Sequence, residues 1–219
     1  MLAEPPEPWR GFLADIDRLL ASQRNSSPIE LHCVGGFVVA MCYDLQRVTS
    51  DIDVFEVVPG SALTTLLEAA GKGRPLARKH GVYIDPGSRV ATLPQNYASR
   101  LTELFGGRFA SLRLLVLDPY DLALSKLERN IDRDRDDVLL LSRANFDVGI
   151  LSERYASEVR PFVTGRTSWH DQTMELWLEM IAETRRGNPK TLVSSSWSVS
   201  KFNDRPRRGS ERRLDLPVG

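Results

Sequence analysis

Residues 31–55, LHCVGGFVVAMCYDLQRVTSDIDVF, decide the fold of this chain. The β-branched and apolar run at 29–34 predicts a buried strand that leads into two glycines, and the apolar residues 37–43 predict one or two buried helical turns. A second apolar run at 52–58 predicts another strand. The stretch therefore indicates a strand, a turn, a short helix and a second strand, in that order.

The glycines and the aspartates of this stretch have complementary chemistry. Gly35 and Gly36 lack side chains, so their backbone amides can approach a phosphate at the positive end of the following helix. Residues two apart in a strand point to the same face, so we expect Asp51 and Asp53 to project together, roughly 6 to 7 Å apart. Mg²⁺ held between these carboxylates and a nucleotide phosphate would give the geometry of phosphoryl or nucleotidyl transfer.

This pattern resembles the nucleotidyltransferase superfamily whose best-known member is DNA polymerase beta, in which Gly-Gly or Gly-Ser precedes Asp-x-Asp on the next strand. More narrowly, it is similar to the bacterial AbiEii-like proteins and their relatives, many of which are toxins of toxin-antitoxin pairs. The string Arg-x-Thr-x-Asp-Ile-Asp recurs in that group, and residues 47–53 of this chain read RVTSDID. One departure is Gly36, which lacks the hydroxyl that relatives with Gly-Ser place near the phosphates.

Residues 117–141, LDPYDLALSKLERNIDRDRDDVLLL, resemble the second conserved block of that family. The resemblance implies that Lys126 neutralises nucleotide phosphate, and that Asp134 or Asp137 orients Lys126 or touches the metal site. If one helix runs unbroken through 130–132, then Lys126, Arg129 and Arg133 form one cationic stripe. A plainer interpretation of 133–141 is a solvated helix start with local ion pairs. The residues that match the block are Pro119, Asp121, Lys126, Leu127, Arg133, Asp134 and Asp137.

A third carboxylate commonly arrives in this superfamily on a later strand, and Asp85 is the candidate. It ends a predicted strand at 81–85, although an Asp before Pro-Gly also has an ordinary explanation as a turn residue. The predicted catalytic residues are Asp51, Asp53, Asp85 and Lys126, with Asp51 and Asp53 as metal ligands. The predicted nucleotide-binding residues are Gly35, Gly36, Thr49, Lys126 and Arg129.

Other patterns fill in the remaining elements. Helices are predicted at 9–23, from a cap at Ser61 to Ala70, from a cap at Asp118, and within 150–163 and 170–184. Further strands are predicted at 89–93 and 112–117. The expected fold class is α+β, a small mixed sheet flanked by helices with a C-terminal helical region. Its expected parts are a core at 1–145, a helical region at 146–187 and a basic, disordered tail at 188–219.

Composition excludes several classes of protein. The 29 acidic and 29 basic side chains give no net charge, so any contact with RNA must be local. The two cysteines lie in apolar runs and the three histidines are scattered, so we expect no zinc site. No secretion signal is evident and no apolar stretch reaches the ~20 residues that cross a bilayer, so we expect a cytoplasmic protein without a membrane partner.

Three hypotheses about function follow. The first is an Mg²⁺-dependent nucleotidyltransferase that uses an NTP, with an RNA 3′ end such as that of tRNA, or a protein hydroxyl, as acceptor, and with a cognate antitoxin as partner. The second is a non-catalytic module that binds a nucleotide or a partner, which the missing hydroxyl at Gly36 favours. The third is an α/β protein whose Asp-x-Asp only caps a strand.

Overall fold

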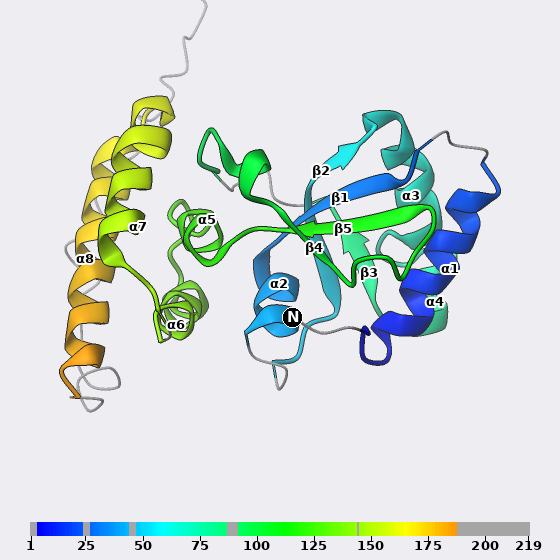
Figure 1. Cartoon of the computed structure of the whole chain (residues 1–219), viewed down its shortest axis with the longest axis horizontal. Coiled ribbons are helices and arrows are strands. Elements are labelled where there is room, and N and C mark those ends of the chain that lie inside the picture. Colours follow the sequence, from blue (N-terminus) through cyan, green and yellow to red (C-terminus); the bar gives the residue numbers. More distant parts are fainter. Residues whose placement is uncertain (1–3, 24–26, 44–46, 87–91, 144, 188–219) are drawn as a thin grey trace, which may run out of the picture.

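The computed structural model describes residues 4–23, 27–43, 47–86, 92–143 and 145–187. Its centre is a five-stranded sheet in the order β3-β2-β1-β5-β4 (Figure 1). The strands are β1 (Ile29–Val34), β2 (Asp51–Val58), β3 (Tyr83–Asp85), β4 (Thr102–Leu104) and β5 (Leu112–Val116). β1 pairs antiparallel with β2 and parallel with β5, so the sheet is mixed. The expected α+β class is confirmed.

The pairing of β1 with β2 contains one irregularity. His32 lies opposite Glu56 while Cys33 lies opposite Val54, so Phe55 is an extra residue in β2. The bulge allows both Val54 and Val57 to be buried although they are three residues apart, whereas Phe55 remains partly exposed. Before the bulge β2 alternates regularly, and its aspartates therefore lie on the face opposite to the core.

Three helices cover one side of the sheet. α1 (Trp9–Ala21), α3 (Leu63–Ala70) and α4 (Pro75–His80) pack together at the end of the molecule opposite to α8 (Figure 1). The prediction that Ser61 caps a helix is wrong, because Ser61 lies inside the 3-10 turn Gly60–Ala62 that precedes α3 and makes no capping hydrogen bond there. Sequence reasoning also missed α4, a short helix that begins at a proline.

The other helices follow β5. They are α5 (Pro119–Leu124), α6 (Asp132–Leu141), α7 (Val148–Arg154) and α8 (Thr167–Arg185). Asp118 caps α5 as predicted, since its Oδ1 accepts hydrogen bonds from the amides of Tyr120 and Asp121 at 3.0 and 2.9 Å. Between α7 and α8 the chain continues through a π-helical turn, Tyr155–Val159, and a 3-10 turn, Arg160–Phe162.

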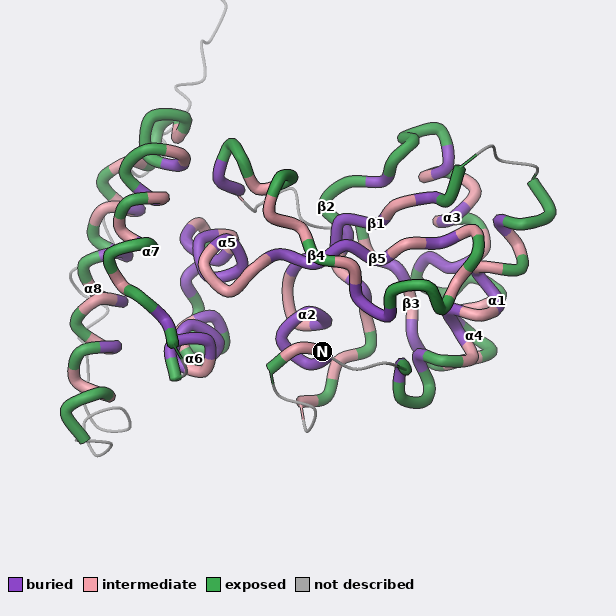
Figure 2. The backbone as a smooth tube through the Cα atoms, in the orientation of Figure 1, coloured by how far each residue is buried: buried purple, intermediate pink, exposed green. Residues whose placement is uncertain are grey.

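A continuous set of buried apolar side chains joins these parts, from Trp9 in α1 to Ile181 in α8. Figure 2 shows the buried residues on the facing sides of strands and helices and the exposed residues on the outer turns. Among the described helices, none combines the length and the apolar character that a membrane span requires. The boundaries at 145/146 and 187/188 stay predictions.

Two predicted segments lie wholly or largely outside the described residues. The tail predicted at 188–219 lies wholly outside them. Of the strand predicted at 89–93, only residues 92 and 93 are described, and these two residues are not in a strand. The strand predicted at 81–85 is shorter than expected and begins at Tyr83. Sequence reasoning missed β4 and the 3-10 turn Tyr97–Arg100 that precedes it.

Candidate active site

The diglycine bend and Asp53 meet at one point of the structure. Gly35 follows β1 directly, begins α2 (Gly35–Cys42) and has a φ of +69°. A Cβ atom at Gly35 would lie 1.9 Å from Oδ2 of Asp53, so no side chain fits there while Asp53 keeps its place. The amide of Gly36 donates a hydrogen bond to the same Oδ2 at 3.3 Å. The first turn of α2 and the carboxylate of Asp53 on β2 are therefore in direct contact.

Three carboxylates gather beside this bend. Asp53 is in register with Asp85 on the parallel strand β3, and Asp51 lies two residues before Asp53. Each is partly exposed. Thr49 orients the first of them, because its Oγ1 donates to Oδ1 of Asp51 at 2.9 Å. Burial, and then the charges of Asp51 and Asp85, raise the pKa of Asp53 above its ordinary value.

This group of carboxylates fits a hard divalent cation that completes its coordination elsewhere. Among residues 4–187 as far as they are described, no three His, Cys, Asp or Glu side chains are already arranged to hold a metal ion. Mg²⁺ commonly takes only one or two protein carboxylates and fills its other positions with water and substrate phosphates. Asp51 and Asp53 match that partial set.

Lys126 lies deeper than its predicted role as a phosphate ligand requires. Its side chain is only 3% exposed, and Nζ lies 2.8 Å from Oδ2 of Asp137 and 3.8 Å from Oδ1 of Asp134. Arg47 shares Asp137. Burial lowers the pKa of Lys126 to about 8, although the charges of Asp134 and Asp53 oppose the shift. Of the two roles predicted for Asp134 and Asp137, the geometry matches the orientation of Lys126.

The prediction of one cationic stripe on an unbroken helix is wrong. α5 ends at Leu124, Asn130 takes a φ of +42°, and α6 begins only at Asp132. The reversal brings Arg129 back onto Asp134, to which it donates two hydrogen bonds of 2.8 and 2.6 Å. The half-exposed Arg129 guanidinium can therefore reach a ligand while it is anchored from behind.

The plainer interpretation of residues 133–141 holds for only part of that segment. Asp132 and Arg135 form an exposed local ion pair of the expected kind. Asp134 and Asp137 are instead buried and bind cations from outside α6. The buried acids therefore organise the cationic side of the site.

Arg133 belongs to the site although sequence reasoning assigned it no contact with the nucleotide. Its Nη2 lies 3.3 Å from the position that a Cβ of Gly36 would take, so the exposed guanidinium stands beside the first turn of α2. Within the described part of the chain, it makes no hydrogen bond or ion pair. The available signal was its place directly before Asp134 in the second block.

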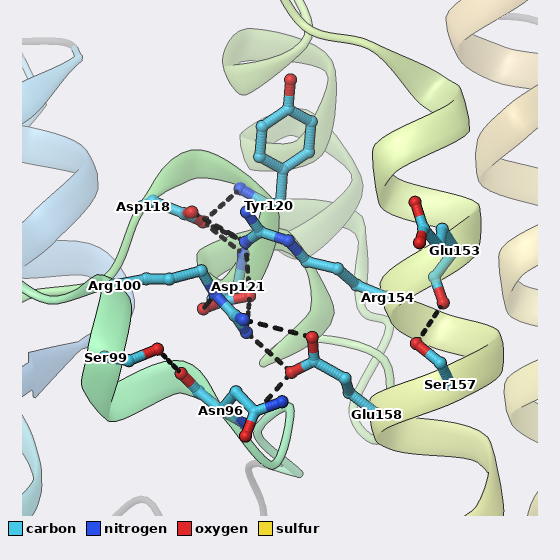
Figure 3. A network of polar contacts seen from close by, with 10 residues as sticks. All are labelled: Asn96, Ser99, Arg100, Asp118, Tyr120, Asp121, Glu153, Arg154, Ser157 and Glu158. Carbon is cyan, nitrogen blue, oxygen red and sulfur yellow. Dashed lines mark hydrogen bonds and ion pairs between the residues drawn. The ribbon is translucent and has the colours of Figure 1, made fainter.

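Asp121, which also matches the second block, lies in a different cluster (Figure 3). Arg100 donates to both of its carboxylate oxygens, at 2.9 and 3.1 Å, and Arg154 donates to Oδ1 at 2.8 Å. Arg154 also pairs with Asp118, and Arg100 also pairs with Glu158. This network joins the turn before β4 to α5 and α7, and its members satisfy one another.

A diglycine bend at a helix start, facing aspartates on the adjacent strand of a mixed sheet, defines the class of nucleotidyltransferases. The chain belongs to the family described as "Nucleotidyltransferase of unknown function (DUF6036)", which matches residues 12–185. The predicted superfamily is thereby confirmed, while the narrower AbiEii-like resemblance stays a prediction. Comparison with curated proteins and with solved structures gave no match.

Proposed function

We propose that this protein is an Mg²⁺-dependent nucleotidyltransferase that moves a nucleoside monophosphate from an NTP to a hydroxyl group. The observation that carries the proposal is the meeting of the Gly36 amide and the Asp53 carboxylate, 3.3 Å apart, at the start of α2. At this place the N-terminus of α2 can bind phosphate, and the adjacent carboxylates of β2 can bind a cation.

Each group near the bend has a proposed role in holding the nucleotide. The amides of Gly35 and Gly36 bind the β- and γ-phosphates, and Asp51 and Asp53 are the protein ligands of Mg²⁺, with Thr49 orienting Asp51. When bound, Mg²⁺ would neutralise charge on the phosphates and on the transition state. Because Gly35 has no side chain, the Asp53 carboxylate can lie directly against the bend, and its hydrogen bond from the Gly36 amide favours a pre-arranged site.

Two kinds of cationic side chain complete the proposed site, exposed arginines and a buried lysine. Arg129 and Arg133 reach the surface and are suited to direct phosphate contact. Lys126 is buried and acts through its field at Asp53, where it offsets part of the charge that develops as pyrophosphate leaves. This assignment keeps Lys126 in the catalytic set without requiring it to leave Asp137.

The proposed reaction balances as a substitution at phosphorus. The acceptor oxygen forms a bond to the α-phosphorus, and the bond from the α-phosphorus to the bridging oxygen breaks, so pyrophosphate leaves with the electron pair. The acceptor's proton passes to a carboxylate, for which we propose Asp85. Asp85 lies beside Asp53 and, among the described residues, forms no ion pair that would hold its charge.

The resemblance to toxin-like nucleotidyltransferases supports an RNA 3′ end, with tRNA as the first candidate, as the acceptor. It also supports a cognate antitoxin as partner, and we propose a cytoplasmic location on the sequence pattern alone. A protein hydroxyl is the alternative acceptor.

The test incubates the purified protein with Mg²⁺, each α-labelled NTP in turn and total cellular RNA, beside an Asp51→Ala, Asp53→Ala double variant. We expect label to be transferred only by the unmodified protein. Binding of NTP without transfer to RNA or protein would instead favour the non-catalytic module, and absence of Mg²⁺-NTP binding would overturn the transferase and leave only a module that binds a partner. Growth arrest on expression, relieved by the double variant, would support the toxin role.

A further inference from the structure

One face of α8 holds the segment that carries Lys126 and Arg129. This segment, residues 125–131, joins α5 to α6. The indole Nε1 of Trp169 donates to the carbonyls of Leu127 and Glu128, each at 3.2 Å. Nε2 of the fully buried His170 lies 2.7 Å from a carboxylate oxygen of Glu128. The backbone and a side chain of the segment are therefore both bound by α8.

The most buried part of this contact is centred on Asn130. Its Oδ1 accepts a hydrogen bond from Nε1 of Trp177 at 3.0 Å, and its Nδ2 donates to Oγ1 of Thr173 at 3.3 Å. All three residues are buried. Asn130 is also the residue with the left-handed backbone at this turn, a conformation that asparagine adopts more readily than most residues. The two helix residues thus hold the side chain of the residue that reverses the chain.

This reversal determines where the cations of the site lie. Residues before Asn130 turn back onto residues after it, which places Lys126 at 2.8 Å from Asp137 and Arg129 at 2.6 Å from Asp134. The carbonyl of Asn130 also accepts a hydrogen bond of 3.0 Å from Arg135 of α6. If the turn relaxed, Arg129 would lose its anchor on Asp134 and its fixed orientation toward the nucleotide.

We propose that Asn130, Trp177 and Thr173 are positioning residues of the nucleotide site, and that α8 acts in the reaction as the support of the Lys126–Arg129 segment. The proposal rests on the function proposed above. None of the three touches the nucleotide; they act through the place and orientation of Lys126 and Arg129. A shift of about 1 Å in such groups can reduce catalysis by about 100-fold.

The central experiment compares Trp177→Phe with Tyr155→Phe. The first removes the indole N–H that binds Asn130 and keeps an aromatic ring, and the second removes a 2.6 Å hydrogen bond to Asp171 of α8 that does not involve the segment. For Trp177→Phe we expect faster amide hydrogen exchange in 125–131 and a KM for NTP raised about tenfold, with a smaller change in kcat. For Tyr155→Phe we expect neither change.

A second pair keeps the test valid if Trp177→Phe does not fold. Thr173→Val removes the hydroxyl at nearly constant volume, whereas Thr173→Ser keeps it. We expect Thr173→Val to raise the KM and the exchange of 125–131, and Thr173→Ser to restore both toward the original values.

Unchanged exchange in 125–131 in both Trp177→Phe and Thr173→Val would overturn the proposal, as would an unchanged KM for NTP in a variant whose segment is loosened. Hydrogen exchange needs no nucleotide, so it separates the two hypotheses. Wild-type protein that binds no Mg²⁺-NTP would refute the proposed function, whereas wild-type binding that both variants retain would refute the positioning role alone.

Discussion

Two clusters of carboxylates differ in how their charges are compensated: one includes Asp118 and Asp121 at the start of the second block, and the other lies beside the diglycine bend. In the network of Figure 3, Asp118, Asp121 and Glu158 are bound by the guanidinium groups of Arg100 and Arg154. Although burial opposes the shift, Glu158 and Asp121 raise the pKa of Arg100. That network is complete without a ligand.

Within the part of the chain that the structure describes, the carboxylates beside the diglycine bend form no such ion pairs, and Lys126 acts on Asp53 only through its field. Asp53 accepts a long hydrogen bond from the Gly36 amide, and Asp51 accepts hydrogen bonds from the hydroxyls of Thr49 and Tyr83. Burial raises the pKa of Asp53 and also that of Asp121, so the two clusters differ in their ion-pair partners and not in the direction of these pKa shifts. In the network of Figure 3 matched charges join the helices, whereas the carboxylates beside the bend lie where we propose that a cation and a nucleotide bind.

The strongest test of this contrast is Asp53→Asn. We expect transfer to fall by about 1000-fold, because loss of a metal ligand removes several kcal/mol of transition-state stabilisation. The melting temperature without Mg²⁺ should stay equal or rise, since the change removes repulsion with Asp51 and Asp85. Transfer assays and thermal unfolding measure the two effects, and a clear loss of stability would show that Asp53 is structural.

The next largest effect is expected for Gly35→Ala, with Gly73→Ala as its control. Both glycines have a left-handed backbone, with φ of +69° and +72°, but an added Cβ meets Asp53 at Gly35 and nothing within 4 Å at Gly73. Strain of about 1 kcal/mol is therefore common to both variants. Only Gly35→Ala should displace Asp53 and reduce transfer, by about 100-fold. Equal activity of the two variants would show that a Cβ at Gly35 does not displace Asp53.

In the network of Figure 3, Asp121→Asn should lower the free energy of unfolding and leave the transfer rate unchanged. Breaking a buried ion pair costs about 3 kcal/mol, because Arg100 and Arg154 lose part of their countercharge. Urea unfolding measures this loss. Asp132→Asn, in an exposed pair with Arg135, is the control and should cost less than about 1 kcal/mol. If Asp121→Asn left the free energy of unfolding unchanged, the network would not be structural.

The smallest expected effect concerns pH and Lys126. With a pKa of about 8, Lys126 loses its proton and its positive charge above that pH. The negative charge at Asp53 is then no longer offset, so kcat/KM should fall about tenfold by pH 9. The unfolded chain holds this proton up to about 10.5, so the contribution of Lys126 to the free energy of unfolding should rise between pH 8 and 10.5.

Lys126→Arg tests that assignment, because a guanidinium keeps its charge over the whole range. We expect this variant to move the alkaline limb of the pH profile upward, even if its overall rate is lower. An alkaline limb that stays near pH 8 in Lys126→Arg would assign the ionisation to another group.

The sequence predicted the parts of this fold that depend on local patterns. The strands around the diglycine and the cap at Asp118 followed from periodicity and from capping chemistry, whereas the hydrogen bond from Gly36 to Asp53 was not predicted. The cationic side was not predictable in the same way. The helical spacing of Lys126 and Arg129 did not predict that Asn130, between α5 and α6, has a left-handed backbone conformation. The side chain of Asn130 is bound by Trp177, which lies far along the chain.

Other errors have similar physical causes. Ser61 has the chemistry of a cap, but the chain enters α3 through a 3-10 turn that begins one residue earlier. The position of Arg133 beside Gly36 places the first turn of α6 next to the first turn of α2, and short-range patterns do not contain a contact between segments so far apart in the chain.

The extra residue at Phe55 has a consequence for how this family can vary. Phe55 has no partner on β1, so removing it would leave Val54 opposite Cys33 and Glu56 opposite His32, with Val54 and Val57 two residues apart on one face of a regular strand. Removal of Ile52 or Asp53 would instead reverse the alternation before Val54 and turn an aspartate toward the apolar interior. A deletion of one residue should therefore be tolerated at Phe55 and selected against at Ile52 and Asp53, a pattern of gaps that related sequences would record.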